Sequence, residues 1–189
     1  ANPFPEEMDV QAMLRKSPKM QWLKDKLTEI SEKGEKAIVF TEFRAVQRSM
    51  KKMLTDCFGL SPVIINGDTN TAAGLYSRQG LIDKFQETEG FNIIILSTTA
   101  VGFGVNVQEA NHVIHFTRSW NPAKEDQATD RAYRIGQKRD VYVYYPTMLD
   151  QAPYISFETN LNRFLAGKRE LARDILATGK ELKVEDFMD

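Results

Sequence analysis

The sequence is poor in several features that would define other classes of protein. It has one cysteine, Cys57, and two histidines among 189 residues. An internal disulfide and a zinc site built from several cysteines are therefore excluded. The 25 basic and 26 acidic side chains give a net charge of -1, so any attraction to nucleic acid must come from a local patch. Apolar runs such as Ile93–Leu96 fall far short of the roughly 18 residues that cross a membrane.

The sequence also lacks a phosphate-binding P-loop. That motif needs Gly-x4-Gly-Lys followed by Ser or Thr, whereas the Gly-Lys pairs at 167–168 and 179–180 are followed by arginine and glutamate. No acidic magnesium-binding motif follows a predicted strand. The amino end is polar, rich in proline and without an initiating methionine, and we expect the chain to be a piece of a longer protein.

Hydrophobic residues alternate along the chain between helical and strand periodicity. Ser17-Pro18 predicts a helix start, and apolar residues at helical spacing continue towards Gly34. Short continuous apolar runs, typical of strands buried on both faces, then alternate with further helical stretches; the runs are 37–40, 62–66, 93–96, 112–116 and 141–145. This order predicts an α/β fold with a parallel sheet and helices on both faces. Ligands of such sheets bind at the loops beyond the carboxyl ends of the strands.

We expect one main domain with an extension at each end. Residues 1–16 are predicted to form a linker or helix, and residues 17–148 the α/β domain. Residues 149–189 are predicted to form a loop and a long amphipathic helix that ends before Gly179.

The most informative segment lies between residues 121 and 137. Asn121 caps a predicted helix and Pro122 opens it, and offsets of four and three place three polar side chains on one face: Gln127, Arg131 and Arg134. Guanidinium groups bind phosphate oxygens in a bidentate manner and stay charged, so this face suits a phosphate ligand. The alternative is a solvated face on which the arginines pair with neighbouring acidic residues.

Polar loops follow three of the predicted strands. The segment Ser97–Asn106 contains glycines that allow close backbone approach and hydroxyls that can donate to phosphate. Thr41–Arg44 and Asn66–Thr69 follow the first two strands. Each loop taken alone is better explained as a turn or a helix cap than as a ligand contact. His112 and His115 alternate on a strand without a partner cluster, which argues against a metal site.

Taken in order, these segments resemble the second, carboxyl-terminal RecA-like lobe of the Swi/Snf-type ATPases, which are DNA translocases and chromatin remodellers of helicase superfamily two. KAIVFTEF is similar to the family's motif IV, NIIILSTTAVGFGVNV to motif V and DQATDRAYRIGQ to motif VI. The Arg-Ala-Tyr-Arg-Ile-Gly-Gln run is highly specific to this family. The resemblance covers Lys19 to Tyr145 and implies a RecA-like parallel sheet with helices on both faces, no P-loop of its own, and a C-terminal helix.

The resemblance also implies a role for each matching position. ATP and Mg²⁺ would bind between two lobes, the first of which supplies the P-loop and the magnesium carboxylates. Motif VI positions that stabilise charge on the γ-phosphate match Gln127, Arg131 and Arg134, and positions facing the nucleotide match Gly102, Gly104 and Asn106. Positions that touch the DNA backbone match Phe43, Arg44, Gly67, Asp68, Thr69, Ser97 and Thr98. The chain departs from the family in motif V, where Val101 replaces a glycine and Thr99 a frequent basic residue.

The implied function is the second motor lobe of a DNA-dependent ATPase that translocates on double-stranded DNA, and we expect this fragment alone to be inactive. The implied partners are the first lobe of the same polypeptide and double-stranded DNA, with a DNA-bound protein as a further candidate and no membrane. An intracellular location is expected, in the cytoplasm or nucleoid of a prokaryote or the nucleus of a eukaryote. Two alternatives stay open. One is a non-catalytic scaffold that keeps the lobe fold; the other is a lobe of a strand-separating helicase, which Trp120-Asn121-Pro122 argues against.

Overall fold

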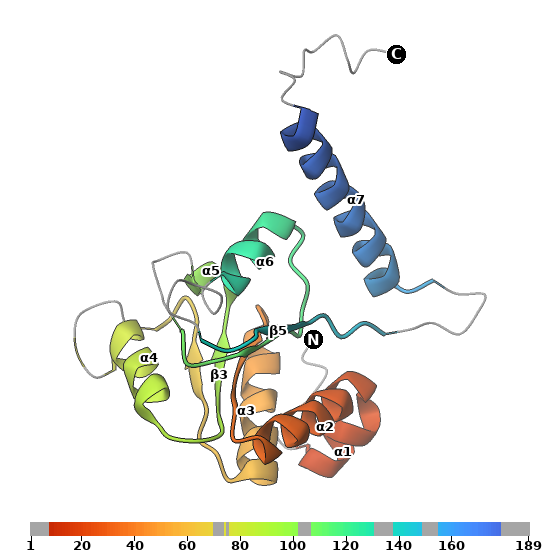
Figure 1. Ribbon diagram of the computed structural model, residues 1–189. Coiled ribbons are helices and arrows are strands. Elements are labelled where there is room, and N and C mark those ends of the chain that lie inside the picture. Colours follow the sequence, from red (N-terminus) through yellow and green to blue (C-terminus); the bar gives the residue numbers. More distant parts are fainter. Residues whose placement is uncertain are drawn as a thin grey trace. The chain divides into compact units, whose positions relative to one another are not determined.

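Five parallel strands form the sheet on which the described part of the chain is built (Figure 1). The structure is a computed structural model that describes residues 8–69, 74, 76–101, 107–130, 138–148 and 155–178. In sheet order the strands are β2 (Val63–Ile65), β3 (Asn92–Leu96), β1 (Lys36–Phe40), β4 (His112–His115) and β5 (Tyr142–Tyr144). The parallel sheet predicted from the alternating periodicity is therefore confirmed.

The strand patterns follow from the position of each strand in the sheet. All five residues of β1 are buried, and its Ile38 pairs with Ile94 of β3 and with Val113 of β4. A central strand covered on both faces has no exposed side, which explains its continuous apolar run. The edge strands β2 and β5 each have one neighbouring strand and are shorter than predicted; β2 is partly buried and β5 is mostly exposed.

Helices cover both faces of the sheet, as Figure 1 shows. The helices α1 (Val10–Lys16), α2 (Pro18–Glu32) and α3 (Arg44–Phe58) pack on one face, in a hydrophobic cluster that includes Leu27, Val39 and Met50. The helices α4 (Arg78–Glu87), α5 (Thr98–Val101) and α6 (Pro122–Thr129) lie on the other face, in a cluster with Ile38 and Phe85. The two clusters are separated by the sheet itself.

Local capping fixes where several helices begin and end. The Ser17 hydroxyl accepts a hydrogen bond of 3.2 Å from the Met20 N–H, and Pro18 occupies the first turn of α2 as predicted. Helix α3 ends at Gly59, whose φ of 65° is the left-handed conformation that glycine adopts readily. The short helix α5 was not predicted, since its four residues carry no helical periodicity.

The chain divides into two compact units, Ala1–Ser119 with Ala123–Pro146 and Trp120–Pro122 with Thr147–Asp189. The second unit contains the predicted C-terminal helix, α7 (Phe157–Thr178). Within this unit the ring of Trp120 contacts that of Phe157 edge to face, with 5.4 Å between their centroids. Among the described helices, none is both long and apolar enough to cross a lipid bilayer.

Candidate functional site

The polar loops singled out in the sequence meet at the carboxyl-terminal edge of the sheet. Because the sheet order is β2-β3-β1-β4, the loop after β3 lies between those after β2 and β1, and the loop after β4 lies beside that of β1. The backbone confirms this neighbourhood: the Ser97 N–H donates to the Ile65 carbonyl, and the Phe116 N–H donates to the Phe40 carbonyl. Four loops that are far apart in sequence thus form one surface.

A buried glutamine joins the loops after β1 and β2. The Gln47 Nε2 donates to the Thr41 carbonyl at 2.7 Å, and its Oε1 accepts from the Asn66 Nδ2 at 2.8 Å. Both Gln47 and Thr41 are 1% exposed, so these bonds are shielded from competing water. Gln47 therefore sets the spacing between the two loops.

The loop after β2 forms a tight turn around Asn66. The Asn66 N–H donates to the Thr69 hydroxyl, and the Asn66 side-chain oxygen accepts from the Asp68 N–H, both at 3.0 Å. The turn presents Gly67 and Asp68 to solvent. Asp68 also forms an ion pair of 2.7 Å with Arg44, in which both side chains are more than half exposed.

The predicted DNA contacts on these two loops are brought together by this arrangement. They comprise Phe43, Arg44, Gly67, Asp68 and Thr69. Phe43 begins α3 and is 63% exposed, which is unusual for a side chain of its size. The positive charge of Arg44 is offset at this point of the surface by the carboxylate of Asp68.

The loop after β3 is held to the loop after β1 by Glu42. The Glu42 carboxylate accepts hydrogen bonds from the N–H and hydroxyl of Thr98, and from the Thr99 hydroxyl at 3.3 Å. Ser97 is buried, and its hydroxyl accepts from the Ala100 N–H at 3.2 Å, which caps α5. The two residues predicted from motif V to contact DNA, Ser97 and Thr98, thus have hydroxyls with partners inside the protein.

The loop after β4 is tied to α6 by a buried ion pair. The Arg118 Nε and Nη2 donate to the two carboxylate oxygens of Glu125 at 2.8 and 2.9 Å, and the Ser119 N–H donates to the same carboxylate. This two-pronged geometry is the strongest form of arginine–carboxylate contact. Gln127, on the same helix, is exposed.

The remaining predicted site residues lie outside the residues that the structure describes. They are Arg131 and Arg134 of motif VI, and Gly102, Gly104 and Asn106 of motif V.

Four polar side chains at this edge were not identified as site residues from the sequence. They are Glu42, Gln47, Arg118 and Glu125. Gln47 carried a usable signal, because it lies in the inward-facing phase of α3 beside Val46 and Met50. Glu125 is one of the acidic residues that could have lain on a solvated face of this helix, whereas it is fully buried and pairs with Arg118.

The opposite edge of the sheet has different chemistry. His112 Nε2 lies 2.6 Å from Glu35 Oε2, and its Nδ1 lies 3.0 Å from the Tyr144 hydroxyl. The hydrogen bond from His112 lowers the pKa of the Glu35 carboxyl, and burial raises the pKa of Tyr144.

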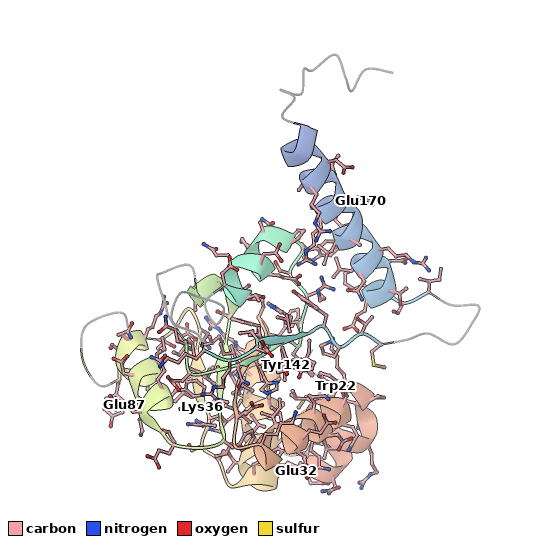
Figure 2. All side chains as sticks on the ribbon, viewed as in Figure 1. Trp22, Glu32, Lys36, Glu87, Tyr142 and Glu170 are labelled. Atoms are coloured by element: carbon pink, nitrogen blue, oxygen red, sulfur yellow. The ribbon has the colours of Figure 1, made fainter. Side chains whose placement is uncertain are left out.

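A cleft of about 210 Å³ opens at this same edge between Lys36, Glu87 and Arg139, and Figure 2 shows Lys36 and Glu87 side by side. Burial lowers the pKa of Lys36, whose ammonium donates to the Gln86 carbonyl.

Three carboxylates at the candidate edge have partners within the protein. Glu42 binds Thr98 and Thr99, Asp68 binds Arg44, and Glu125 binds Arg118. Within the described ranges, no three side chains of the ligating kinds gather as a metal site would require. These three engaged carboxylates have few free oxygens for a divalent cation, which prefers such ligands.

Comparison with known proteins finds a family model and relatives that match this chain. Residues 18–136 match the model of the helicase conserved C-terminal domain. The chain is 57% identical over 173 residues to the Zorya protein ZorD of Escherichia coli O139:H28 (strain E24377A / ETEC), covering 90% of this chain and 16% of that protein. It therefore spans only a small part of that relative's length.

Two solved structures have a similar fold. The C-terminal part of the Fun30 ATPase domain superposes with a TM-score of 0.68 at 35% identity, covering 79% of this chain and 45% of that one. The Sulfolobus solfataricus SWI2/SNF2 ATPase C-terminal domain superposes with a TM-score of 0.63 at 28% identity, covering 86% of this chain and 61% of that one. The RecA-like fold expected from the sequence is confirmed.

Proposed function

Because this chain belongs to the helicase conserved C-terminal domain family and resembles Snf2-type ATPase domains in structure, we propose that it is the second motor lobe of a DNA-dependent ATPase. The motor translocates on double-stranded DNA by opening and closing two lobes around ATP. The observation that carries this proposal is the convergence of four donor-rich loops at one edge of a sheet without a P-loop. Backbone N–H, hydroxyl, amide and guanidinium donors bind phosphate oxygens without reading base sequence.

In the proposed motor, ATP is bound from this lobe by the motif VI and motif V residues. These are Gln127, Arg131, Arg134, Gly102, Gly104 and Asn106. The two arginines stabilise the negative charge that develops on the γ-phosphoryl group during hydrolysis. The exposure of Gln127 on α6 supports this role, since an exposed amide can face a ligand.

The P-loop and the magnesium carboxylates are proposed to come from the first lobe of the same polypeptide. Two facts support this division: the sequence contains no P-loop, and three carboxylates at the candidate edge, those of Glu42, Asp68 and Glu125, have partners of their own. Mg²⁺, when bound there, neutralises charge on the phosphates. The present chain would then hydrolyse no ATP by itself.

DNA is proposed to bind along the loops after β1, β2 and β3. The proposed contacting residues are Phe43, Arg44, Gly67, Asp68 and Thr69, whereas Ser97 and Thr98 shape the third loop through their hydrogen bonds within the protein. Support comes from the Gln47 and Glu42 hydrogen bonds, which hold the three loops as one surface. The near-zero net charge of the chain fits a narrow contact strip better than a broad basic face.

The proposal is tested by DNA-stimulated ATP hydrolysis in the polypeptide that carries both lobes. Arg131→Ala and Arg134→Ala are each expected to lower kcat by on the order of 10³-fold, the scale of arginine fingers in other NTPases. Arg139→Ala is the matched control, since Arg139 pairs with Glu109 at the opposite edge, 3.4 Å away. Turnover that survives in both motif VI variants at the level of the control contradicts the proposed role.

A further inference from the structure

Helix α6 has little hydrophobic anchorage of its own. In its eight residues, all of which the structure describes, Ala128 is the one side chain that joins a hydrophobic cluster. The other buried residues of the helix are Pro122, which opens it, and Glu125, whose carboxylate is fully buried. A helix of this composition must be oriented mainly by polar contacts, because an apolar stripe is lacking.

Glu125 makes several of those contacts. Its carboxylate accepts hydrogen bonds from the Arg118 Nε and Nη2, and one of 2.8 Å from the Ser119 N–H. The Arg118 side chain is 8% exposed and that of Glu125 is 0% exposed. A fork of two parallel bonds between buried partners fixes angle as well as distance, which a single contact cannot do.

The ion pair belongs to a larger set of contacts that also holds the end of α6. The Thr129 hydroxyl, one turn beyond Glu125, lies 2.8 Å from His115 Nε2. His115 stacks on Tyr145 with 4.9 Å between ring centroids, and the Arg118 guanidinium lies 4.4 Å from the centroid of the same ring. Both the first and the last turn of α6 are thereby held by residues at or just after the end of β4, and Tyr145, which follows β5, packs against His115 and Arg118.

The direction of α6 matters because motif VI begins on this helix and continues beyond its end. Gln127 lies on the helix, and Arg131 comes two residues after its last residue, Thr129. We propose that Glu125, clamped by Arg118, is a positioning residue that orients the motif VI face towards the γ-phosphate of ATP. This inference rests on the proposed function, and Glu125 acts through Gln127 and the arginines without touching the nucleotide itself.

The test is Glu125→Gln in the two-lobed polypeptide. The substitution preserves shape while removing the charge that holds the Arg118 fork. We expect kcat of DNA-stimulated ATP hydrolysis to fall by on the order of 10- to 100-fold, the effect of misplacing a catalytic group by about 1 Å. The KM for ATP and the Kd for DNA are expected to stay within about twofold, because an interaction made only in the transition state changes kcat alone.

A second readout separates positioning from general loss of structure. Binding of ADP with aluminium fluoride, which mimics the transferring phosphoryl group, is expected to weaken by about the same factor as kcat, whereas binding of ADP alone stays unchanged. Arg118→Lys keeps the positive charge but loses the two parallel hydrogen bonds to Glu125, so a smaller loss of kcat is expected. This second variant replaces Glu125→Gln should Glu125→Gln fail to fold.

Glu35→Gln is the matched control. It also removes a carboxylate paired with a β4 side chain, His112, but at the opposite edge of the sheet. Its kcat is expected to stay within about twofold of the parent value. The inference is overturned if Glu125→Gln and Arg118→Lys keep kcat within about twofold, if Glu35→Gln loses as much, or if only KM or Kd changes. Full turnover in Arg131→Ala would instead overturn the proposed function itself.

Discussion

Replacing Gln47 by methionine should measure what the buried link between the first two loops contributes to stability. The substitution keeps the length of the side chain but removes the 2.7 Å bond to the Thr41 carbonyl and the 2.8 Å bond from Asn66. Thr41 is 1% exposed, so water cannot replace the lost donor, and such a buried acceptor costs about 1–3 kcal/mol. Asn66 is half-buried and can turn to solvent, so its loss adds at most about 1 kcal/mol.

The expected decrease in the free energy of unfolding is therefore about 2 kcal/mol, or a fall in Tm of about 4–8 °C for a chain of this length. Urea denaturation followed by far-ultraviolet circular dichroism measures it on the 189-residue chain. Gln79→Met is the control, because Gln79 makes a similar 2.7 Å bond to Asp83 on the exposed face of α4, worth about 0.2–0.5 kcal/mol. Equal stabilities of the two variants would refute the buried-link reasoning.

Three further predictions concern acid stability, the core and the DNA surface. A carboxyl whose pKa is lowered by folding stabilises the protein above its unfolded pKa and loses this contribution as the pH falls. The unfolding free energy should therefore decline below about pH 4.5 less steeply in Glu35→Gln than in the parent. Equal slopes in urea titrations of the two proteins would contradict this. Leu27→Ala, at a fully buried position of α2, should lower the unfolding free energy by about 2–5 kcal/mol. Leu171→Ala, at a position 56% exposed, should change it by at most about 0.5 kcal/mol. Similar losses in the two variants would be inconsistent with the packing. In the two-lobed polypeptide, Arg44→Ala should weaken DNA binding and reduce its salt dependence by about one phosphate contact, while Asp68→Asn should strengthen binding. Salt titrations of DNA binding that find no difference between the two variants would show that this loop is not part of the DNA surface.

The fold could be predicted from the sequence because its signals are local. The apolar run at 37–40 indicates a central strand that is buried on both faces. Ser17-Pro18 indicates a helix start, because the Ser17 hydroxyl accepts a hydrogen bond from the first turn of that same helix. The lengths of β2 and β5 were less predictable, since edge strands depend on how many neighbours they have. Helix α5 was not predicted, because part of what holds it is distant in sequence: Glu42, 56 residues away, binds its first residue.

The sequence pointed to the loops that carry the candidate site, but not to the side chains that join those loops. Motif resemblance named residues on each of the three loops that the sheet brings together, because motifs are contiguous in sequence. The side chains that join the loops are not contiguous: Gln47 binds Asn66 across 19 residues, and Thr117 binds Thr41 across 76. The burial of Glu125 could not be predicted either, because nothing in the sequence distinguishes it from its acidic neighbours on α6. The nucleotide roles of Arg131 and Arg134 stay predictions.

The central claim is that this lobe is half of a motor whose phosphate-binding loop lies in another lobe. The most direct measurement is ATP turnover, with and without double-stranded DNA, by the 189-residue chain alone and by the polypeptide that joins it to its P-loop lobe. We predict DNA-stimulated turnover in the joined polypeptide and none above background in the chain alone. Turnover by the chain alone that DNA stimulates and that Arg131→Ala with Arg134→Ala abolishes would contradict the claim.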